Sequence, residues 1–300
     1  MLWVVVMLVS SELNEGRHMN YITYNKAATI CHFFSVIIML SLYIDKPSVL
    51  IPYTETYLEW NKLGTNMTCN IGSRKFETSD GQFCIESVNA PVYCNDKGEC
   101  YGADLGWLVI LFHILSFSFQ GVAWLSDSCG PFFGYQYKYI IGENHNPLRF
   151  IEYAFSASVM LIAIALLNGV TDINLIASIG VLNASCQLCG LAVEYVENIN
   201  IKWLLHLTGW IQFCCAYGII AHAFFKSINA SDMGPPEFVY VIVIVIFILF
   251  SSFGFVQLLE LCINVNPYTK EKTYVILSLT AKLFLGWMIF SNVLLLGNND

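Results

Sequence analysis

Seven long apolar stretches constrain the fold of this chain of 300 residues more than any other feature. They lie near residues 26–45, 104–126, 147–168, 172–195, 201–225, 236–262 and 272–296. A helix needs about 20 apolar residues to cross the hydrocarbon core of a bilayer. Helices also satisfy their own backbone hydrogen bonds in lipid. The sequence therefore predicts an all-α membrane protein, a bundle of seven transmembrane helices.

The composition agrees with lipid as the main solvent of the chain. Hydrophobic residues make up 56% of the sequence and charged residues 12%, whereas a soluble domain has about 25% charged residues. The net charge is −8, and no cluster of basic residues provides the positive patch that nucleic acid requires. We expect the lipid bilayer as a partner and no nucleic acid.

Basic residues at the ends of the apolar stretches predict the orientation. Cytoplasmic loops are enriched in Lys and Arg. If the N-terminus is cytoplasmic, the inner side carries Arg17, Lys26, Lys138, Arg149, Lys202, Lys270 and Lys272, against Lys226 alone in the short outer loops. Residues 1–25 are thus predicted to be a cytoplasmic segment and residues 297–300 to be extracellular. The apolar residues 1–10 are too few to span a membrane, and Met19 is an alternative start of the chain.

Residues 47–103 are predicted to form a long extracellular loop between the first two helices. Aromatic residues set among turn formers predict a short β-hairpin lying on the membrane surface. The loop contains a glycosylation sequon at Asn66 and four cysteines, Cys69, Cys84, Cys94 and Cys100. Four cysteines outside the membrane predict one or two disulfides, with three connectivities if all of them pair. Four free thiols are the alternative.

Lys282 is the most informative residue because it lies near the middle of the last apolar stretch, about 14 Å past Thr273 at 1.5 Å per residue. A lysine at that depth costs about 2.5–3.5 kcal/mol, so we expect it to face the bundle interior. One interpretation is a buried ion pair that only holds helices together. The other is chemical. Burial favours the neutral amine, which is the nucleophile that forms a Schiff base with an aldehyde.

Glu152, in the third apolar stretch, is the predicted counterion of such a Schiff base. At about 4 Å and an effective dielectric constant near 20, the attraction between the two charges is roughly 4 kcal/mol. That energy keeps a Schiff base protonated at neutral pH. The alternatives are a carboxylic acid that is buried and neutral, or a pair with Arg149 one turn away.

Other polar groups in the apolar stretches indicate a polar core around a cofactor. Ser278 lies one turn before Lys282 on the same helix face, and single polar groups on other helices are His32, His113, Asn183 and Gln257. Each of them alone is ordinarily a contact between helices. The aromatic residues that could complete an apolar pocket are Phe250, Phe253, Phe255, Trp210, Phe213 and Tyr217, although such rings can also face lipid.

Three segments resemble heliorhodopsins. Residues 146–160, NPLRFIEYAFSASVM, are similar to the third-helix motif of that family, residues 250–257, FSSFGFVQ, to its sixth helix, and Ser278-x-x-x-Lys282 to its seventh. The resemblance extends from the first helix to the last. It implies that residues 26–296 form a domain with all-trans retinal covalently bound to Lys282 and Glu152 as its counterion. It also implies that the chromophore is surrounded by Ser278, His32, His113, Asn183, Phe250 and Gln257.

The resemblance further implies a homodimeric photoreceptor that is not an enzyme, transports no ions, and signals to an unknown partner. Some family members from giant viruses resemble proton channels. This sequence departs from the family at Phe150, where Trp is usual, and has ionisable groups at His222 and Glu237 near the outer helix ends. A light-gated proton channel or transporter that uses Glu152, His222 and Glu237 is therefore an alternative. Glu237, which follows two prolines, could equally just complement a helix dipole.

A third hypothesis needs no chromophore. In that case the chain is a seven-helix receptor or transporter without retinal, and Lys282 is only a charge partner.

Overall fold

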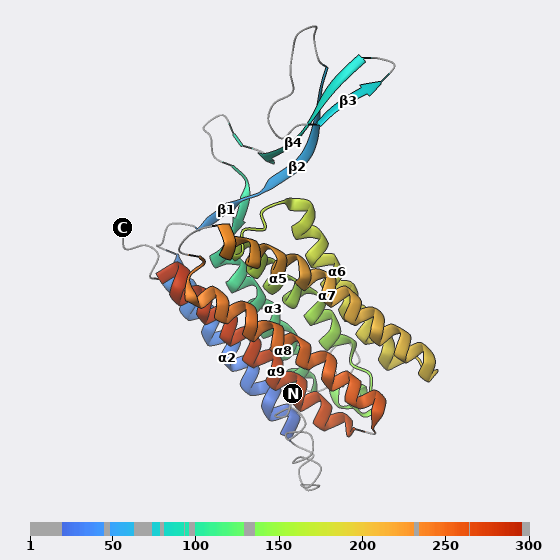
Figure 1. The fold of residues 1–300 in the computed structure, drawn as a ribbon. Coiled ribbons are helices and arrows are strands. Elements are labelled where there is room, and N and C mark those ends of the chain that lie inside the picture. The colour runs from blue at the N-terminus through green and yellow to red at the C-terminus, as the bar shows by residue number, and fades with distance from the viewer. Residues whose placement is uncertain are drawn as a thin grey trace.

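The computed structural model describes residues 20–44, 49–62, 74–78, 81–92, 94–95, 100–128, 136–230, 234–263 and 265–295. Most of the predicted N-terminal segment (residues 1–19) and the predicted extracellular C-terminus (297–300) lie outside the described residues. The long helices are α2 (Asn20–Tyr43), α3 (Leu105–Ser128), α5 (Pro147–Leu167), α6 (Ile173–Tyr195), α7 (Ile199–Ala230), α8 (Glu237–Cys262) and α9 (Pro267–Ile289). They form one bundle (Figure 1). A short helix, α4 (Tyr137–Gly142), precedes α5, and a π-helical turn, Phe290–Leu295, extends α9.

The prediction of seven membrane-spanning helices is confirmed, because seven of the described helices are long and apolar enough to cross a bilayer. The largest difference at a helix start is in the first helix, which begins at Asn20 rather than at residue 26. The last helix begins at Pro267 rather than at residue 272. Its first turns contain Lys270 and Glu271, which are only 3% and 2% exposed. Their charges are balanced by ion pairs, and a hydropathy pattern does not reveal this compensation.

Side-chain caps mark the starts of several helices, among them α5, α9 and α6. Asn146 accepts a hydrogen bond from the backbone N–H of Arg149, and Pro147 occupies the first turn of α5. Asn266 and Pro267 start α9 in the same way. Asp172 accepts from the backbone N–H groups of residues 174 and 175 at the start of α6. A side-chain acceptor followed by proline is a favourable helix start, because proline lacks the N–H that would otherwise need a partner.

Helices α5 and α9 are the most enclosed of the seven spans, with 72% and 61% of their apolar windows buried. Helix α5 packs against α3 and α6, and α9 packs against α2 and α8. Glu152 is on α5 and Lys282 is on α9. The two ionisable residues predicted to carry the chemistry are therefore on the helices that are best shielded from lipid.

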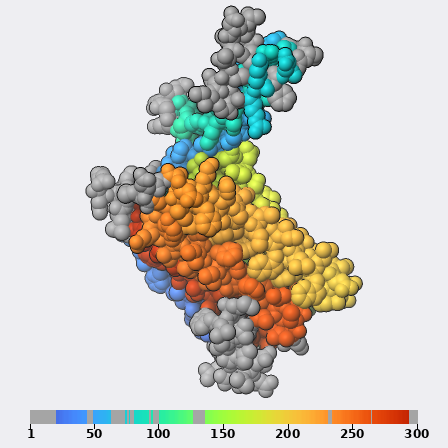
Figure 2. Space-filling model, in the orientation of Figure 1, coloured from blue at the N-terminus to red at the C-terminus, as the bar shows by residue number. Residues whose placement is uncertain are grey.

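Two small antiparallel sheets lie between α2 and α3, where the sequence predicted a single hairpin. Strands β1 (Leu50–Pro52) and β5 (Gly102–Asp104) pair with each other, and β4 (Gly81–Pro91) pairs with both β2 (Thr54–Lys62) and β3 (Arg74–Thr78). The three-stranded sheet projects away from the helix bundle and does not lie flat against its end (Figures 1 and 2). The predicted single hairpin was incomplete, because a third strand, β3, pairs with the edge of β4 that β2 does not occupy.

Hydrogen bonds anchor the base of these sheets on the bundle. The backbone N–H of Thr56 donates to Asp172 Oδ2 at 3.0 Å. The hydroxyl of Tyr43, at the end of α2, donates to Asp104 Oδ1 at 2.5 Å. These contacts connect the first loop to the start of α6 and to the end of α2.

Three of the four first-loop cysteines lie in the described part of the chain, and all three are disulfide-bonded, as predicted. Cys94 bonds to Cys100, and Cys84 is also disulfide-bonded. Cys69 and the sequon at Asn66 lie outside the described residues.

Candidate functional site

Lys282 and Glu152 form a buried ion pair in the bundle interior. Lys282 Nζ donates to Glu152 Oε1 at 2.6 Å, and the two residues are 2% and 4% exposed. The same ammonium group lies 5.3 Å from the centroid of the Tyr153 ring, which adds a cation–π contact. Arg149, the alternative partner of Glu152, makes its ion pairs with other carboxylates. The site therefore contains an amine and a single adjacent carboxylate, shielded from solvent.

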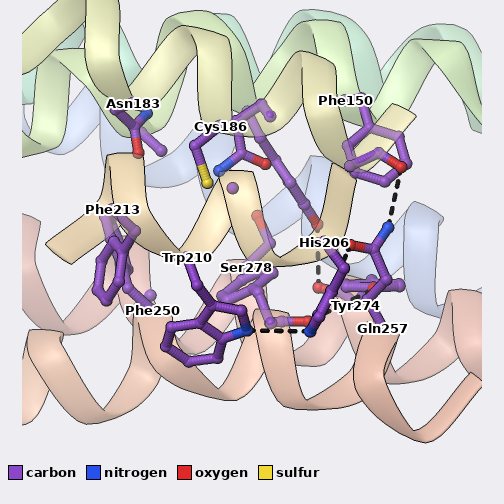
Figure 3. Close-up of a pocket in the computed structure, with 18 of the residues that line it drawn as sticks. Phe150, Asn183, Cys186, His206, Trp210, Phe213, Phe250, Gln257, Tyr274 and Ser278 are labelled. Atoms are coloured by element: carbon purple, nitrogen blue, oxygen red, sulfur yellow. Dashed lines mark hydrogen bonds between the residues drawn. The ribbon is translucent and has the colours of Figure 1, made fainter. Parts of the chain in front are cut away.

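A cavity opens beside Lys282 between the helices. Its empty space is ≈ 840 Å³, opening included. Helices α5 to α9 all contribute side chains to its wall. Figure 3 shows aromatic rings and a few polar groups pointing into the same space. The aromatic residues of the wall are Phe150, Tyr153, Trp210, Phe213, Phe250, Phe253 and Tyr274.

Four of the predicted binding residues line this cavity together with Lys282: Ser278, Asn183, Phe250 and Gln257. Asn183 Nδ2 donates to Ser158 Oγ at 3.0 Å, which joins α6 to α5. Gln257 Nε2 donates to the carbonyl oxygen of Gly190 at 2.9 Å, which joins α8 to α6. The structure thus brings together residues from three helices, α6, α8 and α9, that the sequence analysis assigned to one pocket.

His32 and His113 are placed together, but they are not among the residues that line the cavity. Their Nδ1 atoms lie 2.9 Å apart between α2 and α3, and both residues are 0% exposed. The close approach of α9 to this pair depends on Gly286, because a Cβ there would lie 2.4 Å from His113 Nε2. The two histidines form a separate buried polar contact next to the helix of Lys282.

His222 and Glu237 lie apart from the pair of Glu152 and Lys282. Both are exposed, on α7 and at the first position of α8. Neither lines the cavity. Glu237 follows Pro236 in the first turn of α8, where a carboxylate complements the helix dipole.

The sequence analysis missed His206, which also lines the cavity. Trp210 Nε1 donates to His206 Nε2 at 3.0 Å, and His206 Nδ1 lies 3.2 Å from Gln257 Oε1. The spacing of four residues between His206 and Trp210 puts both on one face of α7. That spacing was the available signal, because Trp210 was already among the aromatic candidates.

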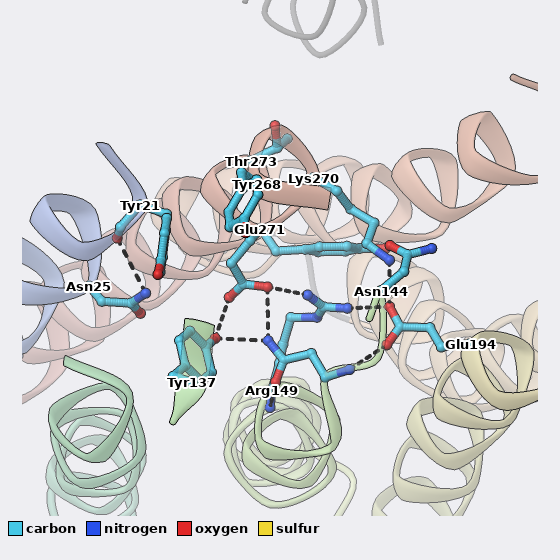
Figure 4. A network of polar contacts seen from close by, with 12 residues as sticks. Tyr21, Asn25, Tyr137, Asn144, Arg149, Glu194, Tyr268, Lys270, Glu271 and Thr273 are labelled. Carbon is cyan, nitrogen blue, oxygen red and sulfur yellow. Dashed lines mark hydrogen bonds and ion pairs between the residues drawn. The ribbon is translucent and has the colours of Figure 1, made fainter. Parts of the chain in front are cut away.

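A second buried cluster, the Arg149 network, joins the ends of α5, α6, α8 and α9 (Figure 4). Arg149 pairs with Glu194, at 2.5 Å, and with Glu271. Lys270 Nζ lies 2.9 Å from both Glu194 Oε1 and Glu260 Oε1.

Helix α4 also contributes to the Arg149 network through Tyr137. Its hydroxyl donates to Glu271 Oε1 at 2.5 Å. Burial and the neighbouring carboxylate of Glu271 raise the pKa of Tyr137 well above its usual value of 10, so this hydroxyl remains a donor at neutral pH. Every carboxylate of the network has a cationic partner, and the network ties four spanning helices together.

We expect Arg149→Ala to destabilise the fold by about 3–5 kcal/mol, because removing one partner leaves a buried charge uncompensated. Glu271 loses its cationic partner, and Glu194 retains only Lys270. Thermal unfolding of the purified protein in detergent measures the effect as a lower melting temperature. Lys226→Ala, at an exposed position of α7, is the matched control, with an expected change within about 0.5 kcal/mol. Equal melting temperatures for the two variants would contradict this account.

Comparisons with known proteins agree with this architecture. The family model described as heliorhodopsin matches residues 21–294. No curated protein sequence matches the chain.

Solved rhodopsin structures share the fold at low sequence identity. The transmembrane domain of the Salpingoeca rosetta rhodopsin phosphodiesterase aligns with a TM-score of 0.59 at 10% identity, over 97% of this chain and 95% of that one. Thermophilic rhodopsin from Rubrobacter xylanophilus aligns with a TM-score of 0.57 at 12% identity, over 90% of this chain and 95% of that one. Cyanorhodopsin from the cyanobacterium Tolypothrix aligns with a TM-score of 0.53 at 13% identity, over 93% of this chain and 96% of that one.

Proposed function

Because this chain belongs to the heliorhodopsin family of retinal-binding membrane proteins, we propose that it is a light sensor in which Lys282 binds retinal covalently as a Schiff base. The family is photoreceptive and not enzymatic. The observation that carries the proposal is the position of the Lys282 amine, 2.6 Å from a buried carboxylate and in the wall of a cavity. An aromatic cavity suits an apolar polyene, and the lysine supplies the nucleophile.

Lys282 is a better attachment point than Lys270, the other buried lysine of α9. Lys270 is 3% exposed, but its ammonium group is held by both Glu194 and Glu260. It is also not among the residues that line the cavity. Lys282 has one carboxylate partner and direct access to the cavity. The two lysines thus differ in what surrounds them, although both are buried on the same helix.

Glu152 supplies the negative charge that a protonated Schiff base at Lys282 requires. It already lies next to Nζ and is nearly solvent-free. A buried pair of opposite charges attracts more strongly than the same pair in solution. Glu152 therefore stabilises the positive charge of the amine and, in the proposed pigment, that of the Schiff base. Ser278, Asn183, Phe250 and Gln257 would surround the bound polyene, since they line the same cavity.

Reconstitution with all-trans retinal tests the proposal. The purified protein should acquire a visible absorption band, and hydroxylamine under illumination should bleach it by removing the retinal from the lysine. A protein that stays colourless with retinal would instead support the receptor or transporter without a chromophore.

We propose sensing without net ion transport. The support is that His222 and Glu237 are exposed and stand apart from the buried pair, so they extend no chain of ionisable groups from Glu152. Voltage-clamp recording of illuminated cells tests this part separately. A photocurrent whose direction follows the proton gradient would establish the channel alternative.

We also propose that the N-terminus is cytoplasmic, which puts the sheets on the outside. The support is the distribution of basic residues and the position of the start of α2 at the bundle end opposite to the sheets (Figure 1). In a host that glycosylates secreted proteins, Asn66 should carry a glycan. The expected result is a glycosidase-sensitive mass shift that Asn66→Gln reduces. A chain that inserts but never gains the glycan would contradict this orientation.

A further inference from the structure

A chain of hydrogen bonds crosses the cavity wall from α7 through α8 to α6. Trp210 Nε1 contacts His206 Nε2 at 3.0 Å, His206 Nδ1 contacts Gln257 Oε1 at 3.2 Å, and Gln257 Nε2 contacts the Gly190 carbonyl oxygen at 2.9 Å. His206 is only 4% exposed. All four residues line the cavity, and Figure 3 shows the tryptophan and the histidine facing each other.

We call this chain of hydrogen bonds, Trp210–His206–Gln257–Gly190, the relay. The groups at its two ends, an indole N–H and a backbone carbonyl, determine which partner donates in every bond. An indole N–H is a donor only, so His206 Nε2 must be the acceptor. A carbonyl oxygen is an acceptor only, so the Gln257 amide nitrogen must donate to Gly190. Gln257 Oε1 then remains as an acceptor for His206 Nδ1–H. His206 is therefore the neutral tautomer with its proton on Nδ1, and every polar group of the relay is satisfied.

Two glycines set the position of the aromatic rings next to this relay. A Cβ on Gly254 would lie 2.7 Å from Trp210 Cζ2, so the indole occupies the space where a side chain would be. A Cβ on Gly190 would lie 2.6 Å from Phe150 Cε1. Gly190 thus receives the Phe150 ring and also accepts the last hydrogen bond of the relay. The relay therefore connects the contact of Trp210 with Gly254 to the contact of Phe150 with Gly190.

We infer that His206 is a positioning residue of the retinal pocket: it links Trp210 to Gln257 and holds the indole against Gly254. The inference rests on the proposed function for its effect on colour, but not for its effect on the tryptophan. Without the acceptor at His206 Nε2, the indole N–H of Trp210, which is half-buried at the cavity wall, is left without its partner. We then expect the Trp210 indole to rotate away from Gly254, which changes the shape of the cavity wall.

A pair of substitutions separates hydrogen bonding from packing. In His206→Gln, the side-chain oxygen can accept from Trp210 and the amide nitrogen can donate to Gln257 Oε1, so the relay is retained. In His206→Leu, both bonds are lost at similar volume. Trp210→Phe removes the indole and, with it, both the donor and the ring atoms that lie against Gly254. We expect the absorption maximum of the pigment with retinal to shift in His206→Leu and to stay close to wild type in His206→Gln.

The indole N–H signal of Trp210 in an NMR spectrum of the retinal-free protein gives a readout that does not depend on colour. Trp210→Phe identifies the signal by its disappearance. The signal should move in His206→Leu and remain near its original position in His206→Gln. If wild-type protein is colourless but the signal behaves in this way, the proposed function fails and the positioning role stands. An unmoved signal in His206→Leu, or equal displacement in both variants, would overturn the positioning role.

Discussion

Replacing Lys282 by alanine is expected to abolish the visible absorption of the protein in the presence of retinal. The amine is the only group in the cavity wall that can form a Schiff base, since Lys282 is the one lysine among the residues that line the described cavity. Without the covalent bond, retinal has no protonated Schiff base and no strong visible band. The spectrum of the purified variant, recorded before and after addition of retinal, measures the effect.

The control for this experiment is Lys270→Ala, which removes a buried lysine of the same helix. Lys270 holds Glu194 and Glu260 and does not line the cavity. We expect this variant to be less stable but still coloured. A coloured Lys282→Ala variant, or a colourless Lys270→Ala variant that is folded, would contradict the assignment of the attachment point.

Loss of Lys282 also leaves the carboxylate of Glu152 buried without its partner, at a cost of about 3–5 kcal/mol. A colourless variant could therefore simply be unfolded. The double variant Lys282→Ala with Glu152→Gln removes the uncompensated charge. It should be more stable than the single variant and still colourless, because the missing amine and not the missing stability prevents binding.

Replacing Glu152 by glutamine is expected to change the colour and to lower the pH at which the chromophore loses its proton. Glutamine has nearly the same shape but no charge, so the roughly 4 kcal/mol attraction at an effective dielectric constant near 20 disappears. At about 1.4 kcal/mol per unit, the midpoint of the titration falls by about three pH units. Because the carboxylate stabilises the protonated form, its removal favours the deprotonated form, which absorbs at shorter wavelength. A pH titration of the absorption spectrum measures the shift.

Glu271→Gln is the matched control for this prediction. Glu271 is as buried as Glu152, but its partners are Arg149 and Tyr137. Its substitution should affect stability and leave the midpoint near that of the wild type. If Glu152→Gln leaves both spectrum and midpoint unchanged, another group balances the charge at Lys282.

The number and kind of the spanning elements followed from the sequence alone. Each span is a local run of apolar residues, and lipid accepts such a run only with its backbone hydrogen bonds satisfied inside the segment. The cost of a charged side chain in lipid identified Lys282 as a functional candidate, because a lysine near the centre of a span is unfavourable wherever the other helices lie. These inferences needed no knowledge of which helices are neighbours.

The pairing of charges was decided by the tertiary structure. Arg149 and Glu152 are one turn apart, yet Glu152 pairs with Lys282, which is 130 positions away, and Arg149 pairs with Glu194 and Glu271. Spacing along one helix says which residues share a face. It does not say which other helix that face meets. The early start of α9 has the same origin, since its charged first turns are compensated by residues of α5, α6 and α8.

His206 shows most clearly what could not be predicted from the sequence alone. A histidine on an apolar helix has two nitrogens, and either can donate or accept a hydrogen bond. His206 Nε2 accepts from Trp210 of its own helix, whereas Nδ1 has a partner only because Gln257 of another helix lies beside it. Hydropathy acts on each segment separately, whereas hydrogen bonds and ion pairs act over about 3 Å between segments. Local sequence therefore determines which segments cross the membrane, and the packing of all seven helices determines which polar groups meet inside them.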